Sequence, residues 1–216
     1  MNQVSTNLDR NRPRNDGSGN MEVLTAAAES FMERGFHASS IDDVARRISS
    51  TKGRIYHYYC SKVDLFFDVH REGMRRNFAA IAPAMAQEGT GAQRLSLMLK
   101  QYALSMMENL PFETVVVQGV HMYRIIATTP AQRCVLAELM AIRNDFESLF
   151  KTVALDGVQD GSLQISDVSI AIKAALGSIS WLVVWYRPRP NETHHDRLIL
   201  ADKLVESLMN GLSTRV

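Results

Sequence analysis

The residue types best suited to binding chemistry gather in a short stretch of the chain, from Thr51 to Lys62. Lys52 and Arg54 carry hydrogen-bond donors that suit guanine edges or phosphate oxygens, and Thr51 can contact a base edge or a thymine methyl group. Gly53 has no side chain, so another backbone can approach it closely. The remaining donors suit phosphate oxygens and would position the segment without reading sequence: Tyr56, His57 and Lys62. A plainer interpretation is a solvated cationic helix whose aromatic residues fill a small core.

Two short helices joined by a tight turn are predicted around this stretch. Ser39 and Asp42 have the spacing of a capping box, which predicts the start of the first helix. The pair Ser49-Ser50 interrupts the apolar repeat, and Thr51 can cap a second helix over residues 52–58. Two helices of this length joined by a turn of about three or four residues form a helix-turn-helix unit.

A longer helix is predicted to follow this unit, over about residues 62–80. Ser61 and Asp64 repeat the capping-box spacing at its start. The second short helix can pack inward through Ile55 and Tyr59, which lie on one face. The other polar side chains of that short helix are therefore expected on the outside.

The rest of the chain is also predicted to be helical, which makes the fold class all-α. Apolar residues recur at helical spacing, as in Leu24, Ala27, Ala28 and Phe31, and Gly35 is placed to end that helix. No segment alternates with period two, as a half-buried strand would. About nine helices are expected, the later ones near residues 95–106, 129–157, 166–185 and 193–210. The prolines beyond the N-terminal tail are expected between helices: Pro83, Pro111, Pro130, Pro188 and Pro190.

Composition excludes several classes of protein. The 216 residues are 46% hydrophobic and 22% charged, which is typical of a soluble globular protein and not of a disordered one. The longest strongly apolar stretch, residues 179–186, is far shorter than the roughly 20 residues of a membrane-spanning helix, and the N-terminus lacks the apolar core of a signal peptide. Cys60 and Cys134 show neither metal-site nor disulfide-framework spacing. We therefore expect a cytoplasmic protein with no membrane, metal or cofactor partner.

Sequence signatures of catalysis are also missing. The six histidines form no metal-site spacing, and the chain has no G-x-S-x-G motif, phosphate-binding loop or dinucleotide fingerprint. The expectation is a protein without catalytic residues.

The near-neutral net charge of +1 conceals a local basic segment. Residues 44–62 hold five Lys or Arg and no acidic residue, whereas residues 81–216 hold 12 basic and 13 acidic residues. A cluster of Lys and Arg within one short segment is the electrostatic footprint expected of a nucleic-acid-binding surface.

The segment from about residue 21 to 70 resembles the DNA-binding domain of the tetracycline-repressor (TetR) family of bacterial transcription regulators. In that family a Gly-aromatic pair precedes the second helix, and a Lys-Gly-x-apolar-Tyr run with a later Ser-Lys-x-x-Leu surrounds the third. This chain supplies matching residues in the same order and spacing: Gly35-Phe36, Ser40-Ile41, Asp43-Val44-Ala45, Lys52-Gly53, Ile55-Tyr56-His57-Tyr58-Tyr59, Ser61-Lys62 and Leu65.

Two positions depart from the family pattern. The turn between the short helices usually has glycine followed by an apolar residue, where this chain has Ser49-Ser50. Because serine tolerates positive φ poorly, the turn is expected to take another conformation or to carry some strain. Cys60 stands where proline is common, and it is either a bystander or a reactive thiol near a helix start.

The resemblance implies an N-terminal three-helix domain with a helix-turn-helix and a C-terminal helical domain that binds an effector and dimerises. The implied parts are a flexible tail over residues 1–20, a DNA-binding domain over residues 21–66 and an effector-binding and dimerisation domain over residues 67–216. The implied contacts to double-stranded operator DNA are Ser39, Ser40, Thr51, Lys52, Gly53, Arg54, Tyr56, His57 and Lys62. The tail residues Arg10, Arg12 and Arg14 can reach a minor groove, or simply belong to a disordered end.

The C-terminal part carries candidates for the effector site. A ligand cavity is mostly apolar with a few polar groups. Polar residues that interrupt the apolar stripes there are Tyr102, Gln118, His121, Arg124 and Arg143. Each can equally be a surface residue or a satisfied core residue. His121 and Arg124, one helical turn apart, are candidate anchors for an acidic or carbonyl group.

By the same resemblance, the last two predicted helices form the interface of a homodimer. The tetrapeptide Trp185-Tyr186-Arg187-Pro188 is similar to one in a subset of the family that responds to coenzyme A thioesters, although it can also serve only to cap a helix and pack the dimer. We therefore expect a repressor that a small-molecule effector releases from its operator, the effector being an acyl-CoA thioester or another hydrophobic acid. The alternative is a helical ligand-binding or scaffolding dimer whose Ser49-Ser50 turn no longer supports specific DNA binding.

Overall fold

The structure is a computed structural model that describes residues 17–125 and 129–210, without the side chains of residues 17–18 and 121–125. The described residues form helices and no β-strand, which confirms the all-α prediction. In chain order the helices are α1 (Gly17–Ala38), α2 (Ile41–Arg47), α3 (Lys52–Tyr58), α4 (Lys62–Met85), α5 (Gly91–Glu108), α6 (Leu110–Ile125), α7 (Pro130–Gln159), α8 (Val168–Ser180), α9 (Leu182–Trp185) and α10 (His194–Met209).

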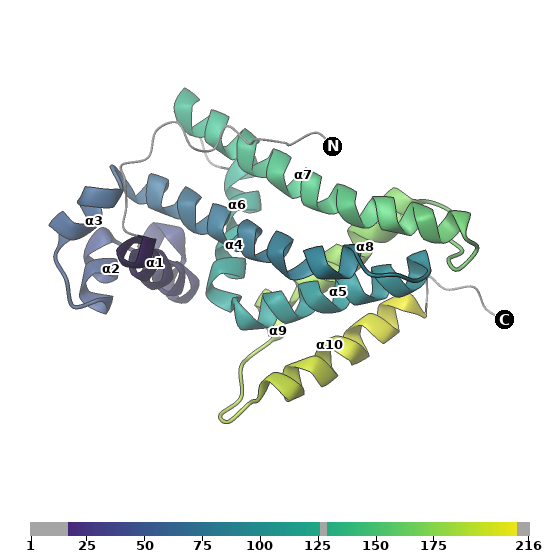
Figure 1. Ribbon diagram of the computed structural model, residues 1–216. Helices are drawn as coiled ribbons and strands as arrows, with labels where there is room; N and C mark the ends of the chain where they lie inside the picture. Colours follow the sequence, from purple (N-terminus) through teal and green to yellow (C-terminus); the bar gives the residue numbers. More distant parts are fainter. Residues whose placement is uncertain (1–16, 126–128, 211–216) are drawn as a thin grey trace.

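Helices α1, α2 and α3 lie together at one end of the molecule, called here the short-helix end, and the larger bundle forms the rest (Figure 1). Helices α1, α2 and α3 surround the start of α4, which runs from this end into the bundle formed by α5, α7, α8 and α10. Helix α6 packs against both α1 and α4, so it joins the two ends of the molecule. The short-helix end and the larger bundle are therefore connected through α4 and α6.

Two hydrophobic clusters correspond to these two ends. The first holds Phe31, Ile55 and Phe66 from the short-helix end together with residues of α6 and α7. The second is built from α4, α5, α7, α8 and α10 around side chains such as Met98 and Phe150. Helix α4 contributes to both clusters, and it runs past the predicted domain boundary at residue 66 without a break. Because both clusters are closely packed, a movement of α4 in one cluster also displaces its contacts in the other.

The capping box of α2 lies one residue later than predicted. Ser40, and not Ser39, is the N-cap: its Oγ accepts a hydrogen bond from the Asp43 amide at 3.2 Å, and its own amide donates to Asp43 Oδ2 at 2.9 Å. Gly35 interrupts α1 with φ 74°, as predicted, in a region that favours glycine. That kink turns the Ser39 hydroxyl inward, where it donates to the carbonyl oxygens of Ser30 and Gly35.

Other helix boundaries also differ from the predicted ones. Pro83 lies inside α4 and not between helices, because in the last turn its missing amide removes only one hydrogen bond. Pro111 lies within the first turn of α6, where amides lack helical partners in any case. Pro130 begins α7 behind the N-cap Thr129, as predicted. The single helix predicted over residues 166–185 is divided at Trp181 into α8 and α9.

The apolar run that includes α8 and α9 is longer than the predicted 179–186. Among the described residues, Val168–Trp185 is the one segment long and apolar enough to cross a membrane by length and composition. Its side chains Ile172, Ala175, Ile179 and Leu182 are buried in the second cluster. One side of the run therefore packs into the core of the bundle, and the other side lies at the surface of the single chain.

Candidate DNA-binding face and effector cavity

The turn between α2 and α3 keeps a left-handed residue although the chain has no glycine there. Ser49 has φ 50°, a region that non-glycine residues rarely adopt, so the expected strain is present. The turn is closed by hydrogen bonds from the Ser49 amide to the Arg46 carbonyl at 3.1 Å and from the Ser50 amide to the Ala45 carbonyl at 2.9 Å. The Ser49-Ser50 pair therefore preserves the helix-turn-helix geometry.

Helix α3 presents one polar face to solvent. Ile55 and Tyr59 are buried beneath it, as predicted, and the Tyr59 hydroxyl donates to Asn20 Oδ1 at 2.6 Å. Tyr56 is 52% exposed although it is a large aromatic residue. The other exposed members of the predicted contact set on this face are Thr51, Lys52, Gly53 and His57. An exposed aromatic side chain beside cations is an arrangement suited to a phosphate backbone.

The two cations of α3 are held by acidic residues of neighbouring helices. Lys52 Nζ lies 2.6 Å from Asp42 Oδ2, and Arg54 Nη2 lies 2.5 Å from Glu22 Oε2. The hydrogen bonds that the two cations donate to these carboxylates raise the pKa of both cations above their usual values. Because exposed ion pairs stabilise a fold by only about 0–1 kcal/mol, they can exchange for contacts to DNA at little cost.

Two predicted DNA contacts, Lys62 and Ser39, make hydrogen bonds to backbone carbonyl oxygens within the protein. Lys62 Nζ donates at 2.8 Å to the carbonyl oxygens of Phe36 and Ser39, and it lies 4.4 Å from the centre of the Phe36 ring. Desolvation of the half-buried ammonium group lowers its pKa. The Ser39 hydroxyl is buried, whereas Ser40 is exposed at the N-terminus of α2 with its hydroxyl bonded to Asp43. Lys62 and Ser39 thus fix the α1–α2 junction rather than facing outward.

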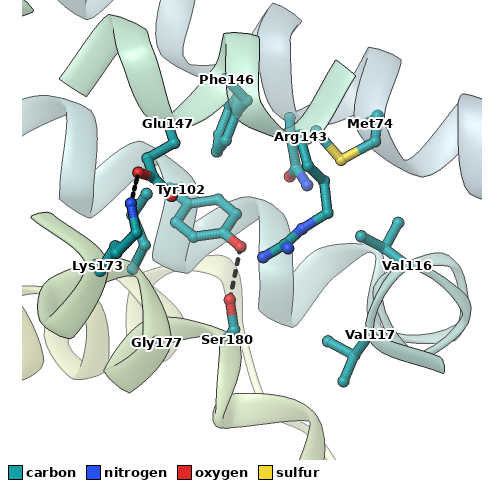
Figure 2. A pocket seen from close by; sticks show the side chains of 12 residues that line it. Met74, Tyr102, Val116, Val117, Arg143, Phe146, Glu147, Lys173, Gly177 and Ser180 are labelled. Atoms are coloured by element: carbon teal, nitrogen blue, oxygen red, sulfur yellow. Dashed lines mark hydrogen bonds and ion pairs between the residues drawn. The ribbon is translucent and has the colours of Figure 1, made fainter. Parts of the chain in front are cut away.

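A cavity of about 240 Å³ lies inside the larger bundle (Figure 2). It is lined by residues of α4, α5, α6, α7 and α8: Met74, Asn77, Tyr102, Val116, Val117, Arg143, Phe146, Glu147, Lys173, Leu176, Gly177 and Ser180. The Tyr102 and Ser180 hydroxyl oxygens are 2.9 Å apart. The structure thus brings together two of the predicted effector residues, Tyr102 and Arg143, with several that sequence analysis did not identify.

Among the predicted effector residues whose side chains the structure describes, Gln118 does not line this cavity. Gln118 Nε2 donates to the Phe31 carbonyl at 3.1 Å, so this side chain connects α6 to α1. The side chains of His121 and Arg124 lie outside the described residues, and so do the tail residues Arg10, Arg12 and Arg14. Among the described residues, no group of three or more His, Cys, Asp or Glu side chains could hold a metal ion.

A buried polar network lies beside the cavity. Asn77 Nδ2 donates to Glu113 Oε2 at 2.9 Å, and Ser105 Oγ donates to Asn77 Oδ1 at 2.7 Å. Glu113 is fully buried, and this desolvation raises the pKa of its carboxyl from the usual 4.5 to about 8. Burial likewise lowers the pKa of His70 to about 3. At neutral pH both side chains are therefore mainly uncharged.

Replacing Glu113 by glutamine is expected to remove a pH-dependent part of the stability. Because folding raises the pKa of Glu113, its stabilising contribution is complete below about pH 4.5 and is lost as the pH rises towards about 8. The free energy of unfolding of Glu113→Gln, measured relative to that of the wild type, should therefore rise between pH 5 and pH 8 by an amount on the order of a few kcal/mol. Denaturant unfolding of both proteins at the two pH values measures this gain, in which the common His70 contribution cancels. Glu88→Gln, at an exposed glutamate, should follow the wild type, and an equal stability difference at both pH values for Glu113→Gln would contradict the assignment.

Comparison with known proteins assigns both parts of the chain. The family model described as "Bacterial regulatory proteins, tetR family" matches residues 23–69, and the one described as "Tetracyclin repressor-like, C-terminal domain" matches residues 88–212. The chain is 21% identical over 201 residues to the fatty acid metabolism regulator protein of Bacillus subtilis (90% of this chain, 96% of that protein). It is 26% identical over 212 residues to the transcriptional repressor KstR2 of Rhodococcus jostii (94% and 97%). The crystal structure of AibR in complex with isovaleryl coenzyme A and operator DNA superposes with a TM-score of 0.70 at 18% identity (88% and 97%).

Proposed function

Because the chain belongs to the TetR family of DNA-binding transcriptional regulators, which are not enzymes, we propose that it is a cytoplasmic repressor that a small-molecule effector releases from its operator. The exposed face of α3 is the observation that carries this proposal. It presents Lys52, Tyr56 and His57 outward while Ile55 anchors the helix, which is the arrangement of a recognition helix in a major groove. The alternative, a dimer without specific DNA binding, depended on a turn altered by Ser49-Ser50. Because Ser49 keeps the left-handed conformation of the turn, that argument for the alternative no longer applies.

A homodimer formed through α8, α9 and α10 supplies a second α3 helix, which binds the second half-site of the operator. This face carries five exposed large hydrophobic residues, namely Ile170, Trp181, Val184, Trp185 and Ile199. Only 28% of the apolar run Val168–Trp185 is buried within the single chain. An exposed apolar surface of this kind is typical of an interface, and a two-fold dimer would place two α3 helices about 34–36 Å apart, in successive major grooves.

Replacing Trp181 by glutamate is expected to weaken the dimer. Trp181 is 61% exposed in the single chain, and a buried unpaired carboxylate at an interface is strongly unfavourable. Analytical ultracentrifugation should show a shift from dimer to monomer at low micromolar concentration. The matched control is Ala141→Glu, on the exposed polar side of α7, which should remain dimeric. A Trp181→Glu protein that dimerises as the wild type does would place the interface elsewhere.

The cavity beside α4 is the proposed effector site. Its mixture of apolar side chains with Tyr102 and Arg143 suits a hydrophobic acid or its thioester. The names of two similar proteins, a fatty acid metabolism regulator and a regulator crystallised with isovaleryl coenzyme A, favour the same class of compound. Effector binding would act by preferring a dimer whose α3 helices are wrongly spaced, with α4 linking cavity and DNA-binding end.

Selection of genomic DNA fragments followed by gel shifts at several salt concentrations tests the proposal. Sequence-selective retention that weakens with rising salt is expected, since phosphate contacts release counterions. Retention without sequence preference at every salt concentration would reject an operator-binding function. Acyl-CoA thioesters and free hydrophobic acids, added separately, should include at least one compound that releases the selected fragment.

A further inference from the structure

We infer that the cavity holds the free carboxylate of a compact organic acid, with the Arg143 guanidinium as its partner. The inference rests on the proposed effector site and names the chemical class that this site recognises. It assigns Arg143 as the residue that distinguishes an acid from its uncharged derivatives.

Arg143 is a cation at the cavity without an ion-pair partner among the described residues, and Glu113, the carboxyl that acts on it electrostatically, is itself fully buried. Figure 2 shows the Arg143 side chain extending from α7 with the guanidinium near the Tyr102 hydroxyl, and Val116 and Val117 line the same cavity. The side chain is half-buried, and among the described residues no carboxylate forms an ion pair with it. Withdrawing a cation from water without a partner is unfavourable, so the site favours a ligand that brings a negative charge.

The other charged groups around the cavity cannot take this role. Lys173 is already ion-paired with Glu147, which also lies 2.5 Å from Lys151 Nζ, so its ammonium group has a carboxylate partner that Arg143 lacks. Glu113, beside the cavity through Asn77, is mainly protonated at neutral pH because burial raises its pKa to about 8. The local charge at the inner wall is therefore positive and is concentrated on Arg143.

The remaining wall fits the rest of an organic acid. One of the Tyr102 and Ser180 hydroxyls donates to the other at 2.9 Å, which leaves the proton of the accepting hydroxyl as a further donor within the same cavity as Arg143. A planar guanidinium and a hydroxyl donor together match the two oxygens of a carboxylate. Apolar contact with the ligand body is available from Met74, Val116, Val117, Phe146 and Leu176.

Charge and size both favour the free acid over its coenzyme A thioester. A thioester carbonyl is uncharged, so its acyl end would leave Arg143 without a counter-ion. The cavity volume of about 240 Å³ is also below the range of about 300–1,000 Å³ that is usual for drug-sized ligands. A short aliphatic, alicyclic or aryl-substituted acid fits these limits.

Calorimetric titration of the full-length protein tests this assignment with three acids: hexanoate, cyclohexanecarboxylate and phenylacetate. Each is compared with its primary amide and with its coenzyme A thioester. At least one acid should bind, and its amide should bind at least about 10-fold more weakly, since hydrogen bonds between charged groups contribute about 1.5–3 kcal/mol. Binding by none of the acids, equal binding of acid and amide, or binding of the thioesters alone would overturn the inference.

Variants of Arg143 then locate the carboxylate. Arg143→Met should weaken the acid about 10- to 100-fold and leave weak amide binding unchanged, which also shows that the cavity has folded. Arg143→Lys should be intermediate, because an ammonium group keeps the charge without the planar pair of donors. The matched control is Lys173→Met, which removes a cation from the same cavity that is already paired. An equal loss for Lys173→Met and Arg143→Met would indicate a general charge effect and contradict a specific carboxylate site.

Gel shifts with the selected operator fragment separate this inference from the proposed function. If a thioester alone releases the operator, the proposed repressor function is supported and the inference that the ligand is a free acid is rejected. If the acid binds in an Arg143-dependent way but the protein retains no DNA selectively, the inferred carboxylate site is supported and the proposed repressor function is rejected.

Discussion

Replacing Arg54 by alanine is expected to weaken operator binding about 30-fold or more while leaving the fold intact. An arginine that donates two hydrogen bonds to guanine contributes about 1–3 kcal/mol of discrimination, and a two-fold dimer makes the contact twice. Arg54 is available for such a contact because its side chain is 37% exposed and its ion pair with Glu22 lies on the surface. Loss of that exposed ion pair should change the free energy of unfolding by less than about 1 kcal/mol.

Fluorescence anisotropy with the selected operator and a scrambled duplex at one salt concentration measures this effect. The matched control is Arg189→Ala, since Arg189 is also exposed and near an acidic residue, Glu192, but lies far from α3 in the chain. Glu22→Gln should bind operator at least as tightly as the wild type, because it frees the Arg54 guanidinium without removing it. If Arg54→Ala and Arg189→Ala keep equal selectivity for the operator, the exposed face of α3 does not read the DNA.

Local signals in the sequence were sufficient to predict the two short helices and their turn, although the capping box begins at Ser40 and the Thr51 side chain makes no cap hydrogen bond. Caps, turn residues and the inward pair Ile55 and Tyr59 act within a few residues of one another, so their consequences do not depend on the rest of the fold. The positions of Ser39 and Lys62 were not predictable in the same way. Both depend on the direction that α1 takes after the kink at Gly35, which brings the carbonyl oxygens at its end towards the start of α4.

The cavity was predictable only in part, because five helices far apart in the sequence assemble it. Tyr102 and Arg143 were identifiable as polar residues within apolar stripes. Asn77 and Ser180 gave no such signal, since their role depends on which helix face meets α5 and α7. Gln118 gave the same signal as Tyr102 but points to the Phe31 carbonyl on the other side of α6. Polar residues in an apolar stripe therefore predict burial next to a partner, and the packing decides whether that partner is a ligand or the backbone.

The contact between the start of α5 and the end of α7 is expected to be the position least tolerant of added volume. A Cβ atom at Gly91 would lie 2.1 Å from the Gly157 amide nitrogen and 2.3 Å from its Cα, both backbone atoms. The same contact lets the Gly91 amide donate to Asp160 Oδ2 at 2.7 Å and the Ala92 amide donate to Ser162 Oγ at 3.0 Å. An alanine at position 91 must separate the two helices, so it adds a clash and removes both caps.

Gly91→Ala is therefore expected to destabilise the protein by roughly 3–5 kcal/mol, from about 1–3 kcal/mol of overpacking and about 1 kcal/mol for each lost hydrogen bond. Thermal unfolding should show a melting temperature lower by about 10 °C, since 1 kcal/mol corresponds to about 2–4 °C at this chain length. The matched control is Gly177→Ala on α8, where a Cβ would meet no atom within 4 Å. Its melting temperature should equal or exceed that of the wild type, because alanine favours a helix over glycine. A Gly91→Ala protein as stable as Gly177→Ala would show that α5 and α7 approach less closely than these distances require.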